Sequence, residues 1–511
     1  MKLLNVLLAI LVSLAVFLGV FEVGLRMLGL GPPKVLNQFD AQLGWSPRPG
    51  LEIQRKSSEF SVRFRINEYG MRDDADLKPA KPAGTTRVLC LGDSFTLGYS
   101  VARKDLFVDQ LEHWWNVEER DVQVINAGAE GYSTDQEVAW LMEHGKTWAP
   151  DMVLLFAYEN DLYYNGQDHY LRFPKPRFDA QGNLETAPLV DPGPRPLLAR
   201  TAIGNLLLKK QGLDTFTPPQ ANRPWPKERA PLLPQVPEFL GDALARTQGA
   251  LIALDKQCQA LGAKLAVVMI PSHSAVNEDF AQTYSTHALG IPRSDWDPNR
   301  PVNEFRAAAQ AAGVPFLDPT ETMRAAQASR GDLYFSKDFH LNPLGNQVLA
   351  SFVHEKLHEA GMAPGEGTFL EAMPDVPAAA GPGVPRWLLV YLFLWAVLGS
   401  LYGATYRDEN AGLEFLKVGG LLALIFTIAM GGSALLAGLP PFQAKLALVT
   451  ALVALFGFIF YKMGDRLSTI VELIGAFIAR GHWYLMPLVM ILLSVGSLLV
   501  VAASSPLVAP F

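Results

Sequence analysis

Residues 87–95 read Arg-Val-Leu-Cys-Leu-Gly-Asp-Ser-Phe, an apolar run that ends in Gly92, Asp93 and Ser94. The run has the length and composition of a buried strand, and the three residues after it are common in turns. A serine at a strand-to-helix turn can present its hydroxyl at the edge of a sheet, with its own N–H directed at a developing oxyanion. Gly-Asp-Ser alone is also an ordinary turn, so its meaning depends on the rest of the chain.

Further apolar runs alternate with helical patterns along the middle of the chain. This alternation predicts an α/β domain of three layers, in which helices cover both faces of a parallel sheet. Residues 61–67 are expected to add an edge strand. The expected strands are 87–91, 122–126, 152–156, 264–270 and 314–317, and the expected helices are 107–117, 134–145, 237–261 and 343–360.

Two polar stretches follow the second and third expected strands. Residues 126–134 contain Gly131, and glycine lets a backbone N–H approach a ligand closely. Residues 159–161 read Glu-Asn-Asp, and the side chain of Asn160 offers a neutral donor suited to an oxyanion. Each stretch could equally be a plain turn. Carboxyl ends of parallel strands are nevertheless where functional residues collect.

A fourth stretch, residues 338–343, precedes the last expected helix and reads Asp-Phe-His-Leu-Asn-Pro. In an extended segment, residues two apart point to the same side, so Asp338 is expected to help orient the ring of His340. A positioned histidine can take the proton of a serine hydroxyl and return it to a leaving group. A lone histidine is more often a capping or packing residue, so this motif indicates catalysis only in combination with the other three sequence blocks.

In this order, the four blocks resemble the SGNH/GDSL hydrolase family, over about residues 44–361. The resemblance implies a flavodoxin-like three-layer fold, with Ser94 as nucleophile and His340 as its base. It also implies an oxyanion hole formed by the N–H groups of Ser94 and Gly131 and the side chain of Asn160. No metal and no cofactor are implied.

Two positions depart from the common family pattern. Many members carry aspartate three residues before the histidine, where this chain has Lys337. Asp338 lies two residues before it, which looks like the Asp-x-His of the periplasmic alginate O-acetyltransferase branch, and we take Asp338 as the third catalytic residue. Glu159 replaces a small residue and is expected to narrow the site.

Apolar runs at both ends of the chain predict membrane segments. Residues 3–21 carry no charge, and about 20 apolar residues span a bilayer. No Ala-x-Ala site follows this run, which favours an uncleaved anchor over a signal peptide. Four more spans are expected at 387–404, 416–436, 446–461 and 484–502, with an interfacial amphipathic helix at 465–480.

These patterns divide the chain into five parts. The expected parts are an anchor (1–28), an N-terminal extension (29–85), the catalytic domain (86–362, with a proline-rich insertion at 162–236), a linker (363–385) and a C-terminal transmembrane domain (386–511). The insertion either covers or shapes the site, or is a surface excursion. The C-terminal spans hold almost no ionisable residues, which argues against a pump or channel and favours anchoring or docking.

Lys and Arg beside the spans predict the orientation in the membrane. Most of them fall inside if the N-terminus is cytoplasmic: Lys2, Arg407, Lys462, Arg466 and Arg480, against Lys445 and Arg386 outside. The protein is therefore expected in the cytoplasmic membrane, with its catalytic domain on the periplasmic side.

The composition bears on the partners of the protein and on the state of its two cysteines. The net charge is −7 and no Lys/Arg-rich stripe appears, so nucleic acid is not an expected partner. Cys90 and Cys258 each lie in an apolar stretch, which favours buried free thiols over a disulfide.

The favoured function is acyl-ester chemistry, with acetyl as the expected group, on an exported or cell-surface polysaccharide. Water as acceptor would make the protein an esterase, and a sugar hydroxyl would make it an O-acyltransferase served by a membrane acyl-transfer or export partner. A non-catalytic polysaccharide-binding or assembly role and a lipase or thioesterase activity are the alternatives. The proline-rich and charged insertion disfavours an acyl-chain channel.

Overall fold

The computed structural model describes residues 36–369 apart from short gaps, together with scattered residues at 15–26 and 388–423. The chain divides into two compact units. One comprises Lys34–Pro194 and Lys210–Ala379 and contains every predicted catalytic residue, and the other comprises Met1–Pro33, Arg195–Lys209 and Ala380–Phe511. Among the described residues, no helix is both long enough and apolar enough to traverse a membrane. The five predicted spans and the interfacial helix lie largely or wholly outside the described residues.

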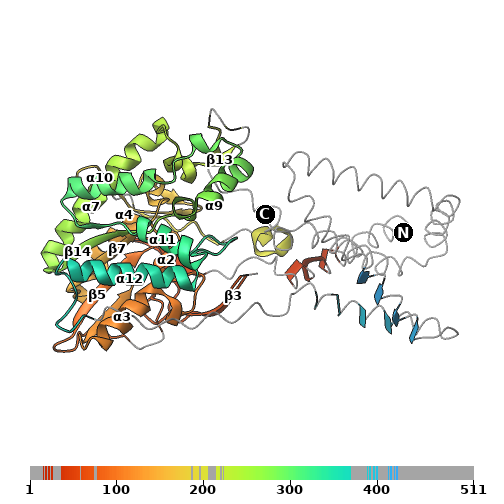
Figure 1. The fold of residues 1–511 in the computed structure, drawn as a ribbon, viewed down its shortest axis with the longest axis horizontal. Helices are drawn as coiled ribbons and strands as arrows, with labels where there is room; N and C mark the ends of the chain where they lie inside the picture. Colours follow the sequence, from red (N-terminus) through yellow and green to blue (C-terminus); the bar gives the residue numbers. More distant parts are fainter. Residues whose placement is uncertain are drawn as a thin grey trace, which may run out of the picture. The chain divides into compact units, whose positions relative to one another are not determined.

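A five-stranded parallel sheet forms the centre of the first unit, with the order β15-β14-β7-β5-β6 (Figure 1). If the five strands are numbered 1 to 5 along the chain and listed from the β6 edge, the order is 2-1-3-4-5. This is the flavodoxin-like arrangement. The strands are β5 (Thr86–Gly92), β6 (Val122–Asn126), β7 (Met152–Ala157), β14 (Lys264–Met269) and β15 (Phe316–Leu317). The predicted parallel-sheet α/β fold of the catalytic domain and all five strands of this sheet are confirmed.

Helices cover both faces of the sheet because each inner strand is apolar on both sides. Successive side chains of a strand point to opposite faces, so Leu89 and Leu91 join one core and Val88 and Cys90 the other. The first core includes residues of α4 (Thr134–Trp148), α7 (Gly241–Leu261) and α10 (Arg300–Ala312). The second includes residues of α3 (Phe107–Val117), α11 (Thr320–Arg330) and α12 (Pro343–Glu359). Cys90 and Cys258 are buried free thiols, as predicted.

The predicted edge strand at residues 61–67 is wrong. Strand β4 (Ser61–Arg65) pairs antiparallel with β3 (Glu52–Lys56) in a separate hairpin and does not join the central sheet. Alternating burial along β4 shows the reason, since Val62 and Phe64 are buried in a small separate core that the extension forms with Leu97. A second hairpin, β1 (Asn37–Asp40) with β2 (Gly44–Pro47), precedes it.

The insertion consists mainly of short two-residue pairings and 3-10 turns. Its hairpins are β8 (His169–Tyr170) with β9 (Phe173–Pro174), β10 (Arg177–Phe178) with β11 (Leu184–Glu185), and β12 (Thr215–Phe216) with β13 (Trp225–Pro226). A 3-10 segment, η3 (Lys227–Leu232), follows the last of them. Side-chain contacts, rather than strand pairing with the central sheet, hold these hairpins against the domain. The contacts near the active site are described below.

Candidate active site

Ser94 begins the short helix α2 (Ser94–Leu97) at the carboxyl end of β5. The side chain of Asp93 caps this helix, because its Oδ1 accepts the N–H of Phe95 at 2.8 Å. Burial raises the pKa of Asp93 to about 6. Ser94 itself is partly exposed, so its hydroxyl is accessible at the end of the sheet.

The structure brings the three predicted catalytic side chains together. Nε2 of His340 lies 2.8 Å from Oγ of Ser94, and Nδ1 of His340 lies 2.6 Å from Oδ1 of Asp338. The side chains of His340 and Asp338 are 19% and 20% exposed, which leaves the pair partly shielded from water. One imidazole thus bridges a carboxylate and a hydroxyl.

The route by which Asp338 reaches His340 differs from the predicted one. Phe339, between them, has a left-handed φ of 66°, so the segment is a turn and not an extended strand. The turn is closed by hydrogen bonds from the N–H of Phe339 to the carbonyl of Phe335 (3.1 Å) and from the N–H of Phe335 to the carbonyl of His340 (2.9 Å). Local backbone sterics disfavour this conformation for phenylalanine, which is why the sequence pattern did not reveal it.

Gly131 and Asn160 follow the two strands beside β5. Gly131 has a φ of 77°, and a Cβ there would meet the ring of Tyr170 at 2.6 Å, so both conformation and space require glycine. Asn160 precedes α5 (Asp161–Tyr164), and its Oδ1 is buried without a hydrogen-bond partner among the described residues. These two residues and Ser94 therefore occupy the carboxyl ends of three adjacent strands, β6, β7 and β5, at the switch point of the sheet.

Glu159 forms an ion pair with the insertion. Its side chain is 4% exposed, and its Oε1 accepts a hydrogen bond from Nη1 of Arg229, in η3, at 2.7 Å. Burial raises the pKa of Glu159, and the guanidinium opposes that rise. Glu159, which directly precedes Asn160, therefore connects the insertion to this edge of the site. The sequence did not predict that role.

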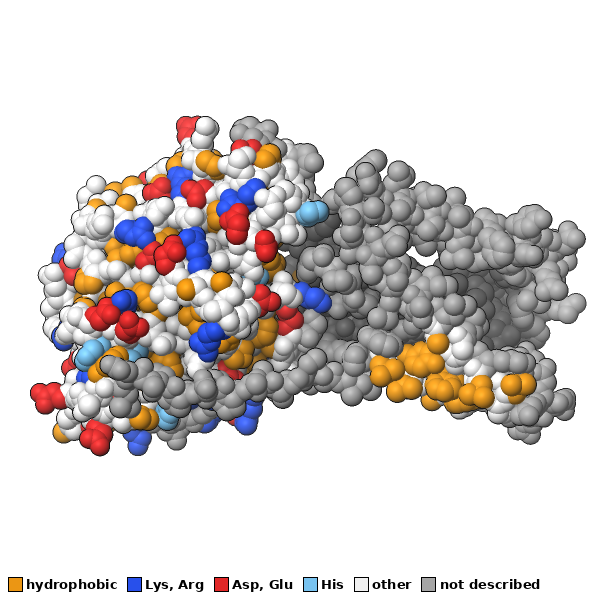
Figure 2. Space-filling view, viewed as in Figure 1, with side chains coloured by type: hydrophobic (Ala, Val, Ile, Leu, Met, Phe, Trp, Pro, Cys, Tyr) orange, Lys and Arg blue, Asp and Glu red, His pale blue; other side chains and the backbone are white. Residues whose placement is uncertain are grey.

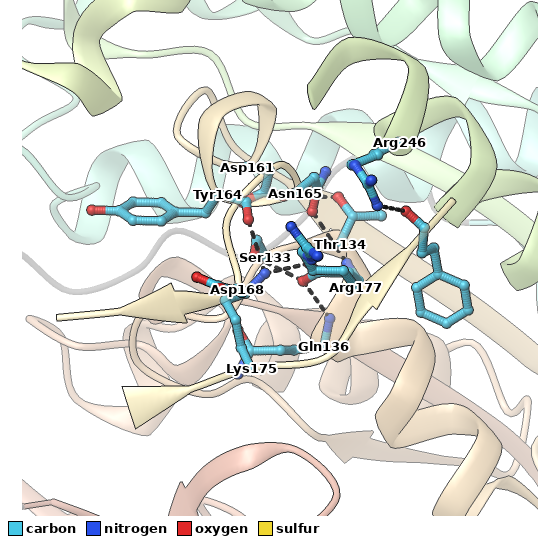
Figure 3. Close-up of polar contacts among 12 residues, drawn as sticks. Ser133, Thr134, Gln136, Asp161, Tyr164, Asn165, Asp168, Lys175, Arg177 and Arg246 are labelled. Carbon is cyan, nitrogen blue, oxygen red and sulfur yellow. Dashed lines mark hydrogen bonds and ion pairs between the residues drawn. The ribbon is translucent and has the colours of Figure 1, made fainter. Parts of the chain in front are cut away.

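A buried polar network fixes the start of α4 and α5 beneath the insertion (Figure 3). Lys175 forms a fully buried ion pair with Asp135 and donates to the carbonyl of Tyr164 at 2.9 Å. Asn165 accepts the N–H of Asp135 at 3.2 Å, and Thr134 donates to Asp161 at 3.2 Å. Because Asp161 directly follows Asn160, this network holds the candidate oxyanion-hole residue in place. Of the two readings of the insertion, these contacts support the one in which it shapes the site.

Aromatic rings surround His340. Tyr99 stacks on the imidazole with centroids 5.0 Å apart, and the guanidinium of Arg55 lies 3.2 Å from the centroid of Tyr99. Phe95 contacts the imidazole and Tyr158, with centroid distances of 4.6 and 4.5 Å. Sequence reasoning missed Tyr99, Arg55 and Arg229, since their relation to the site arises only from tertiary packing.

Lys and Arg side chains are interspersed with Asp and Glu on the visible face of the described catalytic unit (Figure 2). Within the part of the chain that the structure describes, no group of three or more His, Cys, Asp or Glu residues has the arrangement of a metal site.

Comparisons with known proteins identify the family to which the chain belongs. The profile of the GDSL-like Lipase/Acylhydrolase family matches residues 90–348, about half of the chain. Solved structures that match this chain include an esterase from Pseudoalteromonas sp., with 14% identity over 54% of this chain and 98% of that chain and a TM-score of 0.29. A lipase/acylhydrolase from Enterococcus faecalis has 13% identity, coverage of 54% and 97%, and a TM-score of 0.30.

An acetyl xylan esterase has 12% identity to this chain, over 53% of it and 99% of the esterase, with a TM-score of 0.31. No curated protein matches the sequence. Family membership rests on the profile match, which begins in β5 and ends in α12 and so includes Ser94, Gly131, Asn160 and His340. The chain belongs to the GDSL-like lipase/acylhydrolase family of serine ester hydrolases.

Proposed function

We propose that this protein is an ester hydrolase or O-acyltransferase that works through an acyl group on Ser94. The observation that carries the proposal is the continuous hydrogen-bond chain from Asp338 through His340 to the Ser94 hydroxyl, with distances of 2.6 and 2.8 Å. A hydroxyl is a weak nucleophile until a base removes its proton, and this arrangement supplies the base and the group that orients it.

The reaction follows from that geometry. Oγ of Ser94 attacks the ester carbonyl carbon while its proton passes to Nε2 of His340, and the carbonyl electrons become an oxyanion. The N–H groups of Ser94 and Gly131 and the amide of Asn160 donate to this oxyanion. Collapse breaks the ester C–O bond, and His340 protonates the departing alcohol. A second hydroxyl, from water or a sugar, then gives its proton to His340 and attacks the acyl carbon. The bond from that carbon to Oγ of Ser94 breaks, and His340 returns the proton to Oγ, which restores Ser94.

We infer that the acyl group is short, with acetyl as the first choice, and that it is carried by a carbohydrate. Tyr170 contacts Gly131, and Arg229 binds the residue before Asn160, so the insertion brings aromatic and charged groups to the site. Tyr99 and Arg55 add a ring and a cation beside His340. Aromatic and polar side chains at the rim suit a sugar, whereas a long acyl chain needs an aliphatic channel.

The membrane location is part of the proposal. It is supported by the uncharged run at 3–21, by the four apolar runs after residue 386 and by the distribution of Lys and Arg beside them. Leu416, at the start of one of these runs, is 61% exposed, as a lipid-facing side chain would be. A transferase outside the cytoplasm has no access to cytosolic acyl-CoA, so the C-terminal helices would dock a membrane partner that hands over acyl groups for a polysaccharide.

The substrate class is tested with the detergent-purified full chain and aryl esters of increasing acyl length. We expect hydrolysis of the acetate to exceed that of the decanoate, and Ser94→Ala to abolish both. A preference for the decanoate would contradict the carbohydrate-ester proposal and favour a lipase. Adding an oligosaccharide separates the two remaining reactions, because acetylated oligosaccharide marks a transferase and free acetate alone marks an esterase.

The role of the C-terminal region is tested in cells. Deleting residues 387–511 is expected to abolish acetylation of the polysaccharide while hydrolysis of a small aryl acetate by the membrane fraction persists. Loss of both activities would contradict a docking role and make the region necessary for the catalytic unit itself.

A further inference from the structure

The turn of the β3–β4 hairpin contacts the loop that carries the acid and the base. The carboxylate of Glu59 accepts hydrogen bonds from Oγ of Ser336 at 2.8 Å and from the N–H of Asp338 at 3.0 Å. The N–H of Lys337 lies 3.1 Å from both carboxylate oxygens. One side chain from the N-terminal extension thus binds three consecutive residues, 277 to 279 positions away in the sequence.

These bonds fix the backbone at the place where the catalytic turn begins. Hydrogen bonds to an ionised acceptor are stronger than those between neutral groups. Glu59 holds Asp338 through its N–H, which leaves the Asp338 carboxylate for Nδ1 of His340. Next to Glu59, Phe60 packs on Phe335 with ring centroids 5.5 Å apart, so the turn is held by apolar contact as well.

The same hairpin also reaches the other side of the histidine. Arg55 lies on β3, and its guanidinium covers the ring of Tyr99 at 3.2 Å. Tyr99 in turn stacks on His340, with an interplanar angle of 13°. The hairpin therefore contacts the loop before His340 directly and its imidazole through one intervening ring.

We propose that the β3–β4 hairpin, which lies before the family-matched region at 90–348, completes the active site, and that Glu59 is a positioning residue for the Asp338–His340 pair. The inference rests on the proposed function, in which His340 is the base. Glu59 touches neither the substrate nor the reacting atoms. Its effect is to keep the Asp338 carboxylate within hydrogen-bond distance of the imidazole.

The effect of Glu59 on the histidine can be read from the pH profile. The charged and titratable groups around His340 are Asp338 at Nδ1, the buried Asp93, and Tyr99 with Arg55 behind it. A carboxylate that hydrogen-bonds the imidazole favours its charged form. When the Asp338 bond loosens, the imidazolium is less favoured, so the acidic limb of kcat/KM against pH moves to lower pH.

The test compares Glu59→Ala and Glu59→Gln in the full chain, with an aryl acetate as substrate. Misplacing a catalytic group by about 1 Å can cost roughly 100-fold in rate, so we expect Glu59→Ala to lower kcat by about 10- to 100-fold with KM nearly unchanged. Glu59→Gln keeps one acceptor oxygen but turns an NH₂ toward a backbone N–H, and its loss is expected to be smaller. In both variants the acidic limb should shift to lower pH.

Glu52→Gln is the matched control, because Glu52 lies on β3 with its side chain 53% exposed, and it pairs at 3.1 Å with Arg63, whose side chain is also exposed. It should leave kcat and the pH profile unchanged. The inference is overturned if Glu59→Ala, or Glu59→Gln should the alanine variant fail to fold, keeps the original kcat and pH profile while Ser94→Ala is inactive. If Ser94→Ala retains the original activity, the proposed function itself is wrong.

Discussion

Nε2 of His340 lies 2.8 Å from Oγ of Ser94, although 246 positions separate the two residues in the chain. The sheet order creates this contact. Ser94 follows β5, at the centre of the sheet, and His340 precedes α12, which packs against α3 on one face. Because the hydroxyl and the imidazole come from opposite ends of the domain's sequence, their hydrogen bond forms only when the whole domain is folded.

Replacing Asp338 tests the third member of the catalytic set. Asp338→Asn removes the charge that stabilises an imidazolium and can present an NH₂ to Nδ1, so kcat should fall by about 10²- to 10⁴-fold with little change in KM. Steady-state kinetics with an aryl acetate measure this. Lys337→Ala is the control, since Lys337 occupies the position where many family members have the aspartate. Similar losses in both variants would contradict the role of Asp338.

The amide of Asn160 is expected to act on the oxyanion and not on the ground-state ester. Asn160→Ala should lower kcat by about 10²- to 10³-fold and leave KM within a few-fold. A loss confined to KM would show that Asn160 binds the substrate instead.

Arg229→Met should make stability depend on pH through Glu159. Without the guanidinium, the already raised pKa of the buried Glu159 carboxyl rises further. The folded state then keeps a proton that the unfolded state releases above its ordinary pKa of 4.5, so the variant loses stability as pH rises through that window. Removing one partner of a buried pair costs about 3–5 kcal/mol, and we expect a loss of that order at pH 8 and a smaller one at pH 5.

Chemical denaturation at the two pH values, followed by tryptophan fluorescence, measures this difference. The double variant Glu159→Gln/Arg229→Met is the control, because it has no carboxylate at position 159, so its loss of stability relative to the unmutated protein should be about the same at the two pH values. Equal losses for Arg229→Met at pH 5 and pH 8 would contradict the account of Glu159.

Lys175→Met tests whether the buried network fixes the insertion. The substitution leaves Asp135 buried without its cation, at a cost of about 3–5 kcal/mol. Lys146→Met, on the exposed side of the same helix as Asp135, should change stability by less than about 0.5 kcal/mol. Adding Asp135→Asn to Lys175→Met should recover part of the loss. If the two single variants are equally stable, the Lys175 pair does not hold the insertion.

The central sheet could be predicted from sequence because its signals are local. Each inner strand contains a continuous apolar run, and a turn-forming residue (Asp93, Asn160 or Pro271) follows within three positions of its end. The rule that ligands meet at the carboxyl ends of parallel strands then brought Ser94, Gly131 and Asn160 together. The prediction for residues 61–67 was wrong because an alternating pattern indicates a half-buried strand but does not identify the strand with which it pairs.

The supporting contacts of the site could not be predicted in the same way. Glu59 and Arg229 each lie in an irregular segment, and the groups they bind are 279 and 70 positions away. No periodicity or motif relates such residues, since only tertiary packing brings them together. The left-handed Phe339 is a further case, because the surrounding hydrogen bonds impose a conformation that phenylalanine rarely adopts.

The most direct test of the central claim is the intact mass of the full chain after brief exposure to an aryl acetate, followed by peptide mapping. The account predicts a transient increase equal to one acetyl group, located on Ser94, absent from Ser94→Ala and longer-lived in His340→Ala if any forms there. Aryl release without an adduct on Ser94, or an adduct that persists in Ser94→Ala, would contradict it.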